Sequence, residues 1–69
     1  SFSEAYNNLG STFKSLNKYE EAILNYKKSI NLNKKNYEAY FNLASLYFVL
    51  ENYIEAIDYY KICVLYQTD

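Results

Sequence analysis

The side chains that most often carry out catalysis are scarce in this sequence. It has no His and a single Cys, so it lacks a histidine general base, an internal disulfide and the usual zinc-ligand spacings. Its one Gly excludes a glycine-rich loop that would hold a phosphate. We therefore expect no enzymatic activity, no metal and no cofactor, and we interpret Cys63 as a small packing residue.

The polar side chains that recur at a fixed spacing are better suited to binding. Asn8 and Asn42 are 34 residues apart (42 − 8), and so are Ser11 and Ser45. A carboxamide has two N–H donors and an acceptor oxygen, so it can satisfy both the N–H and the C=O of an extended peptide without contacting the peptide's side chains. The spacing predicts a ladder of backbone contacts; solvated helix residues in an Asn-rich chain are the alternative.

The charge balance argues against nucleic acid and membranes as partners. Seven Lys and eight Asp or Glu give a net charge of −1, so the chain has no basic field for a phosphate backbone or an anionic lipid surface. No apolar run approaches the roughly 20 residues of a membrane span. A lone cysteine is typical of a reducing compartment. We expect an intracellular protein, cytoplasmic or nuclear, whose partner is another protein or a peptide.

The 34-residue spacing extends over almost the whole chain. Aligning residues 3–35 with residues 37–69 gives 13 identical pairs among 33 positions without a gap. We therefore divide the chain into two copies of one unit, 3–36 and 37–69. Within each copy, apolar residues recur at the spacing of one face of a helix. In the first copy these residues are Tyr6, Leu9, Phe13 and Leu16, followed by Tyr19, Ala22, Ile23, Tyr26 and Ile30.

Each copy is expected to form two antiparallel helices. The predicted helices cover residues 3–16, 19–32, 37–50 and 53–66. Asn17 tolerates the left-handed backbone that a tight turn between them often needs. Asn36 is the expected N-cap of the third helix, and Asn52 with Glu55 resembles a capping box at the fourth.

Small residues mark the expected contacts between the helices of a copy. Ala22 and Ala56 lie on the second helix of their copies, and Gly10 and Ala44 lie on the facing helix. A larger side chain at Ala22 or Ala56 is expected to cost about 1–3 kcal/mol through overpacking.

Seven positions of each copy resemble the tetratricopeptide repeat, a helix-turn-helix unit of 34 residues. The matching residues are Tyr6, Leu9, Gly10, Phe13, Ala22, Tyr26 and Ser29, and then Tyr40, Leu43, Ala44, Tyr47, Ala56, Tyr60 and Cys63. The resemblance implies an all-α, right-handed solenoid of antiparallel hairpins, with ligands bound on the concave face. Lys34 and Thr68 stand where the family has Pro. Without that stop signal the second helix is free to run on into the third, which would favour domain-swapped dimers.

The segment AYNNLGSTFKSLNKYEEAILNYKKSI is similar to the repeats that precede the catalytic region of O-linked N-acetylglucosamine transferase. In that family an Asn just before Leu-Gly or Leu-Ala lines the inner surface and holds the backbone of substrate proteins. The resemblance assigns this role to Asn8 and Asn42.

The stripe opposite the expected core predicts the residues of the binding groove. They are Glu4, Asn7, Asn8, Ser11, Lys14 and Ser15 in the first copy, and Glu38, Phe41, Asn42, Ser45, Phe48 and Val49 in the second. We expect Phe41, Phe48 and Val49 to form apolar pockets that provide selectivity. The carboxylates of Glu4 and Glu38 favour a basic or uncharged peptide.

The last predicted helix is apolar on nearly every side, which is typical of a buried helix. We expect part of this helix to form an exposed apolar surface that another chain or repeat covers, and its residues to be Ile62, Leu65 and Tyr66. Two hypotheses remain open. The main one is a protein–protein interaction scaffold cut from a longer array, whose next repeat would cover the helix. The alternative is self-association through this helix, as a homodimer.

Overall fold

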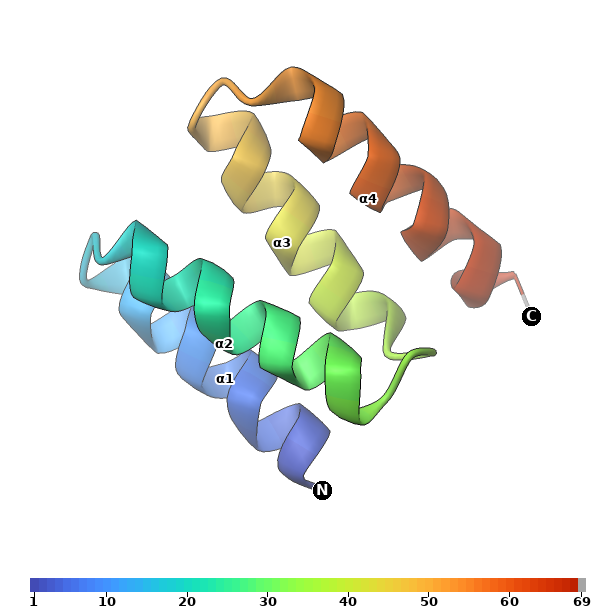
Figure 1. Cartoon of the computed structure of the whole chain (residues 1–69), viewed down its shortest axis with the longest axis horizontal. Helices are drawn as coiled ribbons and strands as arrows, with labels where there is room; N and C mark the ends of the chain where they lie inside the picture. Colours follow the sequence, from blue (N-terminus) through green and yellow to red (C-terminus); the bar gives the residue numbers. More distant parts are fainter. Residues whose placement is uncertain (69) are drawn as a thin grey trace.

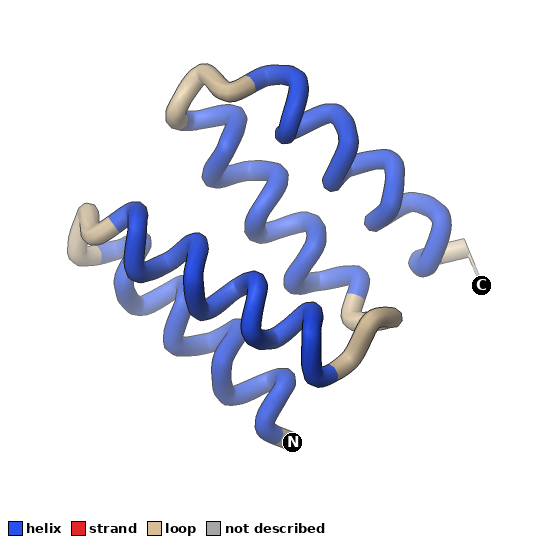
Figure 2. Tube along the Cα trace, in the orientation of Figure 1, coloured by secondary structure: helices blue, strands red, loops and turns tan. Residues whose placement is uncertain are grey.

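The computed structural model describes residues 1–68, and within them every regular element is a helix (Figures 1 and 2). The four helices are α1 (Phe2–Ser15), α2 (Tyr19–Leu32), α3 (Tyr37–Val49) and α4 (Tyr53–Gln67). Each begins and ends within one residue of its expected range. They form two antiparallel hairpins, α1–α2 and α3–α4, which pack side by side through α2 and α3 with a smaller contact between α1 and α3. The expected all-α helical repeat is confirmed.

The repeat units 3–36 and 37–69 stay a prediction. Asp69, the last residue of the second unit, lies outside the described residues.

The two hairpin turns share one backbone design. Asn17 and Glu51 occupy equivalent positions and both adopt the left-handed conformation, with φ of 61° and 63°. In each turn the following N–H donates to the carbonyl oxygen five residues earlier, at 2.9 Å and 2.8 Å. Asn takes this conformation readily, whereas at Glu51 it stores about 1 kcal/mol of strain. The hydrogen bond and the packing of the helices must hold the second turn in place.

The stretch between the hairpins stops the second helix without a proline. α2 ends at Leu32, and Asn33 is extended, with φ −145° and ψ 98°. The Asn33 side chain then accepts a hydrogen bond from the N–H of Lys35 at 3.1 Å, and its carbonyl accepts one from the N–H of Asn36 at 3.1 Å. The expectation that the second helix runs on into the third is therefore wrong, because an Asn turn replaces the missing Pro. The reason for expecting swapped hairpins disappears with it.

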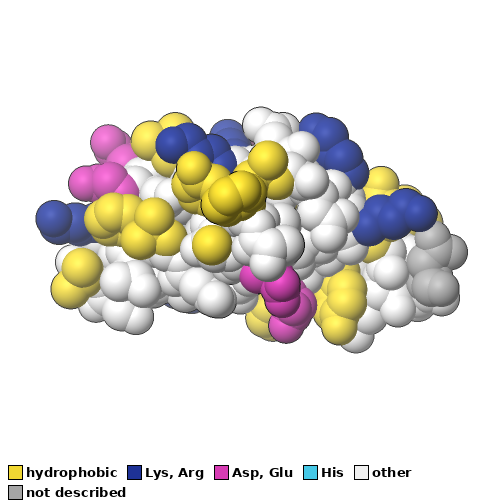
Figure 3. Space-filling view, turned by 90° about the horizontal axis from the view of Figure 1, so that it is seen from below, with side chains coloured by type: hydrophobic (Ala, Val, Ile, Leu, Met, Phe, Trp, Pro, Cys, Tyr) yellow, Lys and Arg dark blue, Asp and Glu magenta, His cyan; other side chains and the backbone are white. Residues whose placement is uncertain are grey.

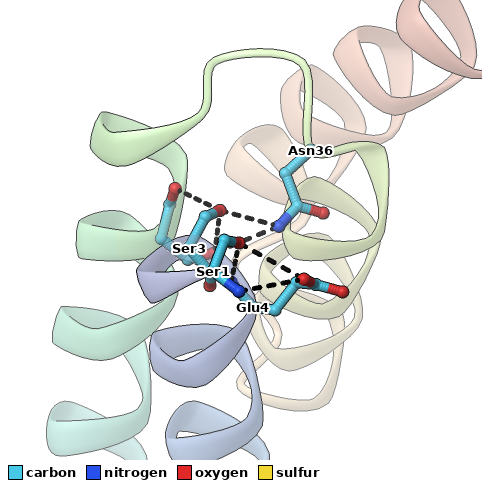
Figure 4. Close-up of polar contacts among 5 residues, drawn as sticks. Ser1, Ser3, Glu4 and Asn36 are labelled. Carbon is cyan, nitrogen blue, oxygen red and sulfur yellow. Dashed lines mark hydrogen bonds and ion pairs between the residues drawn. The ribbon is translucent and has the colours of Figure 1, made fainter.

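The helix caps follow the sequence in one place and depart from it in another. Asn36 caps α3 as expected, because its side-chain oxygen accepts the N–H of Ala39 at 3.2 Å. The expected capping box at α4 is wrong: Asn52 is the N-cap residue, but its side chain makes no capping hydrogen bond. A capping box is found instead at α1, between Ser1 and Glu4 (Figure 4).

The core is centred on α3, which is covered by the first hairpin on one side and by α4 on the other. Leu43 and Leu46 are fully buried there, and Ala22 and Ala56 are buried as expected at the close contacts. The apolar stripe expected on α1 is only partly covered. Leu9, the counterpart of Leu43, is 42% exposed, because no helix packs on the outer side of α1 among the described residues.

Candidate binding surfaces

The predicted ladder residues lie on α1 and α3 but are not equally free. The side chain of Asn8 is exposed and makes no hydrogen bond within residues 1–68. The Asn42 carboxamide is partly buried and donates through Nδ2 to Oδ1 of Asn7 at 3.0 Å, a bond that joins α3 to α1. Asn42 therefore keeps one N–H and its carbonyl oxygen for another partner. The two residues are equivalent in sequence but differ in environment.

The predicted groove hydroxyls are tied to the core. Ser11 Oγ lies 2.9 Å from the hydroxyl of Tyr26, and Ser45 Oγ lies 3.0 Å from that of Tyr60. Each pair joins the two helices of one hairpin. A hydroxyl has one donor and two acceptor sites, so each Ser retains some capacity for a ligand. The first task of these residues is to give a buried or half-buried Tyr its hydrogen-bond partner, which the sequence analysis did not foresee.

The predicted apolar groove residues are exposed on α3. Phe41, Phe48 and Val49 each keep more than half of their surface open to solvent. The ring of Phe41 meets Tyr60 edge-on with centroids 5.8 Å apart, and Phe48 meets Tyr53 at 5.4 Å. These contacts restrict the two Phe rings, so less side-chain conformational entropy is lost when a partner binds them.

A cavity of about 390 Å³ opens where the start of α3 meets the end of α4. Its lining residues are Tyr37, Glu38, Phe41, Asn42, Cys63 and Gln67. Burial raises the pKa of the Cys63 thiol, which keeps it protonated and unreactive at neutral pH. This agrees with the interpretation of Cys63 as a packing residue.

The last helix is only partly the open apolar surface that the sequence predicts. Ile62 and Tyr66 are half-buried and pack against the core, and Tyr66 lies with its ring 5.8 Å from that of Tyr40. Burial, and then the neighbouring tyrosines, raise the pKa of Tyr40. Leu65 is exposed as expected. The other open apolar side chains of α4 are Tyr53, Ile54, Ile57 and Val64.

A polar cluster joins the two hairpins and was not foreseen as a unit. Ser3 and Ser29 are both buried; Ser3 Oγ donates to the Ser29 carbonyl at 2.9 Å, and Ser29 Oγ donates to the Ser3 carbonyl at 2.6 Å. Asn36 Nδ2 then lies 2.9 Å from Ser3 Oγ and 3.3 Å from Ser29 Oγ (Figure 4). We call Ser3, Ser29 and Asn36 the junction cluster. It links α1, α2 and the start of α3.

Replacing Asn36 with Ala is expected to destabilise the chain by about 0.5–2 kcal/mol, because α3 loses its cap and the junction cluster loses its bridging donor. Urea unfolding followed by circular dichroism measures the effect. Asn52→Ala is the matched control, since Asn52 also precedes a helix but makes no capping bond. It should change the free energy of unfolding by less than about 0.5 kcal/mol. Equal losses in the two variants would contradict the assignment.

Other kinds of site find no support in the part of the chain that the structure describes. Residues 1–68 contain no group of three or more His, Cys, Asp or Glu side chains arranged to hold a metal ion. None of the four helices combines the length and the hydropathy that crossing a membrane requires.

The fold and these surfaces define a class: a repeat protein built from stacked helical hairpins. A family profile described as TPR repeat matches residues 10–50, and one described as Tetratricopeptide repeat matches residues 37–68. The chain therefore belongs to the tetratricopeptide repeat family. Repeats of this family generally mediate contacts between proteins and are typically non-catalytic.

The crystal structure of MamA shares this fold. It superposes with a TM-score of 0.94 at 25% sequence identity over 97% of this chain. The matched region is 39% of the MamA chain, so the chain spans well under half the length of that structure. No curated protein sequence matches the chain.

Proposed function

We propose that the chain is a protein-interaction scaffold that holds an extended segment of a partner against α1 and α3. The observation that carries this proposal is the trio Phe41, Phe48 and Val49, which stays more than half exposed on α3. Large apolar side chains grouped on one surface and rimmed by polar residues are typical of interaction sites. Phe41, Phe48 and Val49 would supply most of the binding free energy.

The carboxamides supply the contacts to the partner's backbone. Asn8 offers its whole side chain, and Asn42 offers one N–H and its oxygen. Since a peptide in extended conformation presents unpaired N–H and C=O groups, these side chains bind it in any sequence. The exposed carboxylates of Glu4 and Glu38 make a basic or uncharged segment the better partner.

The test is the affinity of Asn8→Ala with Asn42→Ala for a peptide selected on the chain from a display library of short random peptides. Losing two net hydrogen bonds of about 0.5–1.5 kcal/mol each weakens binding by roughly 5- to 150-fold. Isothermal calorimetry with the selected peptide measures the change.

Asn7→Ala is the matched control for this test. It removes the bond between Asn7 and Asn42 but leaves the Asn42 carboxamide in place. Its affinity should equal that of the unchanged chain. Unchanged binding by the double variant, or an equal loss in Asn7→Ala, would refute the ladder.

A finer version of this proposal is that the chain holds substrates for an enzyme similar to O-linked N-acetylglucosamine transferase. It is supported by the resemblance of residues 5–30 and by the exposed Asn8. A ladder that contacts only backbone predicts that a scrambled version of the selected peptide binds as tightly as the original. Loss of binding on scrambling would instead assign selectivity to the Phe41 and Phe48 surfaces.

Self-association is the second candidate function, supported by the exposed apolar residues of α4. Of the residues expected to form this interface, Leu65 is exposed, whereas Ile62 and Tyr66 are half-buried. A homodimer would therefore use Leu65 together with Ile57 and Val64. The mixing experiment described below distinguishes this symmetric dimer from the arrangement that we favour.

A further inference from the structure

The two hairpins pack against each other through two surfaces, one on each hairpin. Because the sequence repeats, an equivalent of each surface is also present at the opposite end of the molecule, where it is exposed. Shifting residue numbers by 34 carries α1 onto α3 and α2 onto α4. The surface of the first hairpin that receives α3 therefore has a counterpart on the second hairpin, which we call the tail. The face of α3 that packs there has a counterpart on α1, which we call the head. No described helix covers either of them.

The tail matches the surface that α3 covers, residue by residue. Ile30 of α2 is 9% exposed, while its counterpart Val64 of α4 is 57% exposed. Ile23 is half-buried, while its counterpart Ile57 is exposed. Since α2 and α4 each pack against the first helix of their own hairpin, these differences measure the cover that α3 provides. A shallow cavity of about 370 Å³ marks the site, lined by Ile57, Tyr60, Lys61 and Val64.

The head shows the same difference from the other side. Leu43 of α3 is fully buried, while its counterpart Leu9 of α1 is 42% exposed. Tyr40 is buried, while its counterpart Tyr6 is half-buried. In Figure 3 the first hairpin shows hydrophobic side chains gathered near the middle of its outer surface. An apolar helix face with the register of α3 is thus already present on this chain.

The junction cluster supplies the strongest match between the two surfaces. Its Ser3 and Ser29 correspond to Tyr37 and Cys63 in the tail, and its Asn36 corresponds to Phe2 in the head. All three positions change from polar to apolar together. Phe2 is 78% exposed, and Tyr37 and Cys63 line the 390 Å³ cavity described above. An aromatic ring arriving where Asn36 sits in the junction would enter that cavity.

We propose that the tail of one copy of this chain binds the head of a second copy, so that α1 of the second copy packs on α3 and α4 as α3 packs on the first hairpin. The proposed occupant of the tail is a second copy, because the head of this chain has the features that the tail would bind. These are an apolar helix face and the exposed side chain of Phe2. The contact joins two different surfaces, so it leaves one head and one tail free and produces open, head-to-tail oligomers. It borders the proposed groove, because the 390 Å³ cavity of the tail is lined by Glu38, Phe41 and the ladder residue Asn42.

The test uses the whole chain and one charged substitution on each surface. Leu9→Glu disables the head, and Val64→Glu disables the tail. In sedimentation experiments across a concentration series, the unchanged chain should rise in mass beyond a dimer, and each variant alone should remain a monomer. An equal mixture of the two should form a dimer and nothing larger, because it contains one working head and one working tail.

Leu24→Glu is the matched control, since Leu24 is exposed on α2 outside both surfaces and its counterpart is the charged Asp58. It should associate like the unchanged chain. Circular dichroism of every variant establishes that it is folded. A symmetric dimer through α4 would leave Leu9→Glu dimeric by itself, and that result overturns the proposal. A folded, unchanged chain that stays monomeric also overturns it, and the two surfaces would then belong to another partner, such as a further repeat.

A second measurement does not depend on charged substitutions. Phe2→Cys places a thiol where the second copy should approach Cys63, the one native cysteine. Because burial keeps the Cys63 thiol protonated at neutral pH, the oxidation with diamide is carried out at alkaline pH, where the thiolate forms. It should give a ladder of disulfide-linked oligomers, with the link between residues 2 and 63 identified by mass spectrometry. Links between two copies of residue 2 alone would contradict the head-to-tail arrangement.

Discussion

Replacing Leu43 with Ala is expected to leave the isolated chain largely unfolded. Leu43 is fully buried on α3, where both hairpins meet. Removing a buried Leu side chain costs about 2–5 kcal/mol, through lost burial and the cavity left behind. A chain of this size without a disulfide or a metal has a total of roughly 3–5 kcal/mol. Urea unfolding followed by circular dichroism should show the midpoint falling close to zero.

Leu9→Ala is the matched control for this prediction, because Leu9 occupies the same position of the first repeat. It is 42% exposed, so the substitution removes less buried surface and opens no closed cavity. A loss of about 1 kcal/mol or less is expected, measured at a concentration where the chain is monomeric. Equal losses at the two positions would show that α3 is not the centre of the core.

Replacing Gly10 with Ala is expected to destabilise the chain, although Ala is the better helix former. A Cβ at Gly10 would lie 2.7 Å from Cδ1 and 2.8 Å from Cε1 of Tyr26. That ring is buried and its hydroxyl is held by Ser11, so it has little room to move. Overpacking costs about 1–3 kcal/mol, which exceeds the roughly 0.5–1 kcal/mol that Ala contributes in a helix. Thermal and urea unfolding both measure the sign.

Ala5→Gly provides the comparison for Gly10. Ala5 is exposed on the same helix, so this exchange measures the helix propensity alone and should cost about 0.5–1 kcal/mol. If Gly10→Ala instead raises the unfolding midpoint, the Tyr26 ring yields more easily than its burial indicates. In the second repeat Ala44 stands at the position of Gly10, and Tyr60 stands at the position of Tyr26 but is only half-buried.

The regular elements could be predicted from the sequence because local rules decide them. Apolar spacing placed all four helices, and the left-handed tolerance of Asn17 and the capping role of Asn36 were foreseen correctly. These features depend on neighbours within a few residues. The effect of the missing Pro was predicted wrongly even though its replacement is also local. The Asn33 side chain accepts the N–H of Lys35, two residues on, and Asn is itself a turn residue that the prediction did not weigh.

The roles of the candidate binding residues were harder to predict from the sequence than the helices were. Ser11 and Ser45 are predicted to contact a ligand, yet each hydroxyl bonds a Tyr 15 residues away. Asn8 and Asn42 are equivalent in sequence, yet Asn8 is exposed, whereas Asn42 on α3 bonds Asn7 on α1. The recurrence of Ser and Tyr at one spacing in both repeats was a usable signal. Whether any of these residues contacts a peptide stays a prediction.

The sequence by itself determined the repeating pattern and the positions of the four helices, because a 34-residue period and helical spacing are properties of residue order. Only the tertiary structure decided which copy of each residue is buried. Equivalent residues such as Leu9 and Leu43, or Ile30 and Val64, differ in exposure because burial depends on how many neighbours pack on a hairpin, and each hairpin here is covered on one side. Equivalent apolar side chains are therefore buried in the core in one repeat and exposed on the surface in the other.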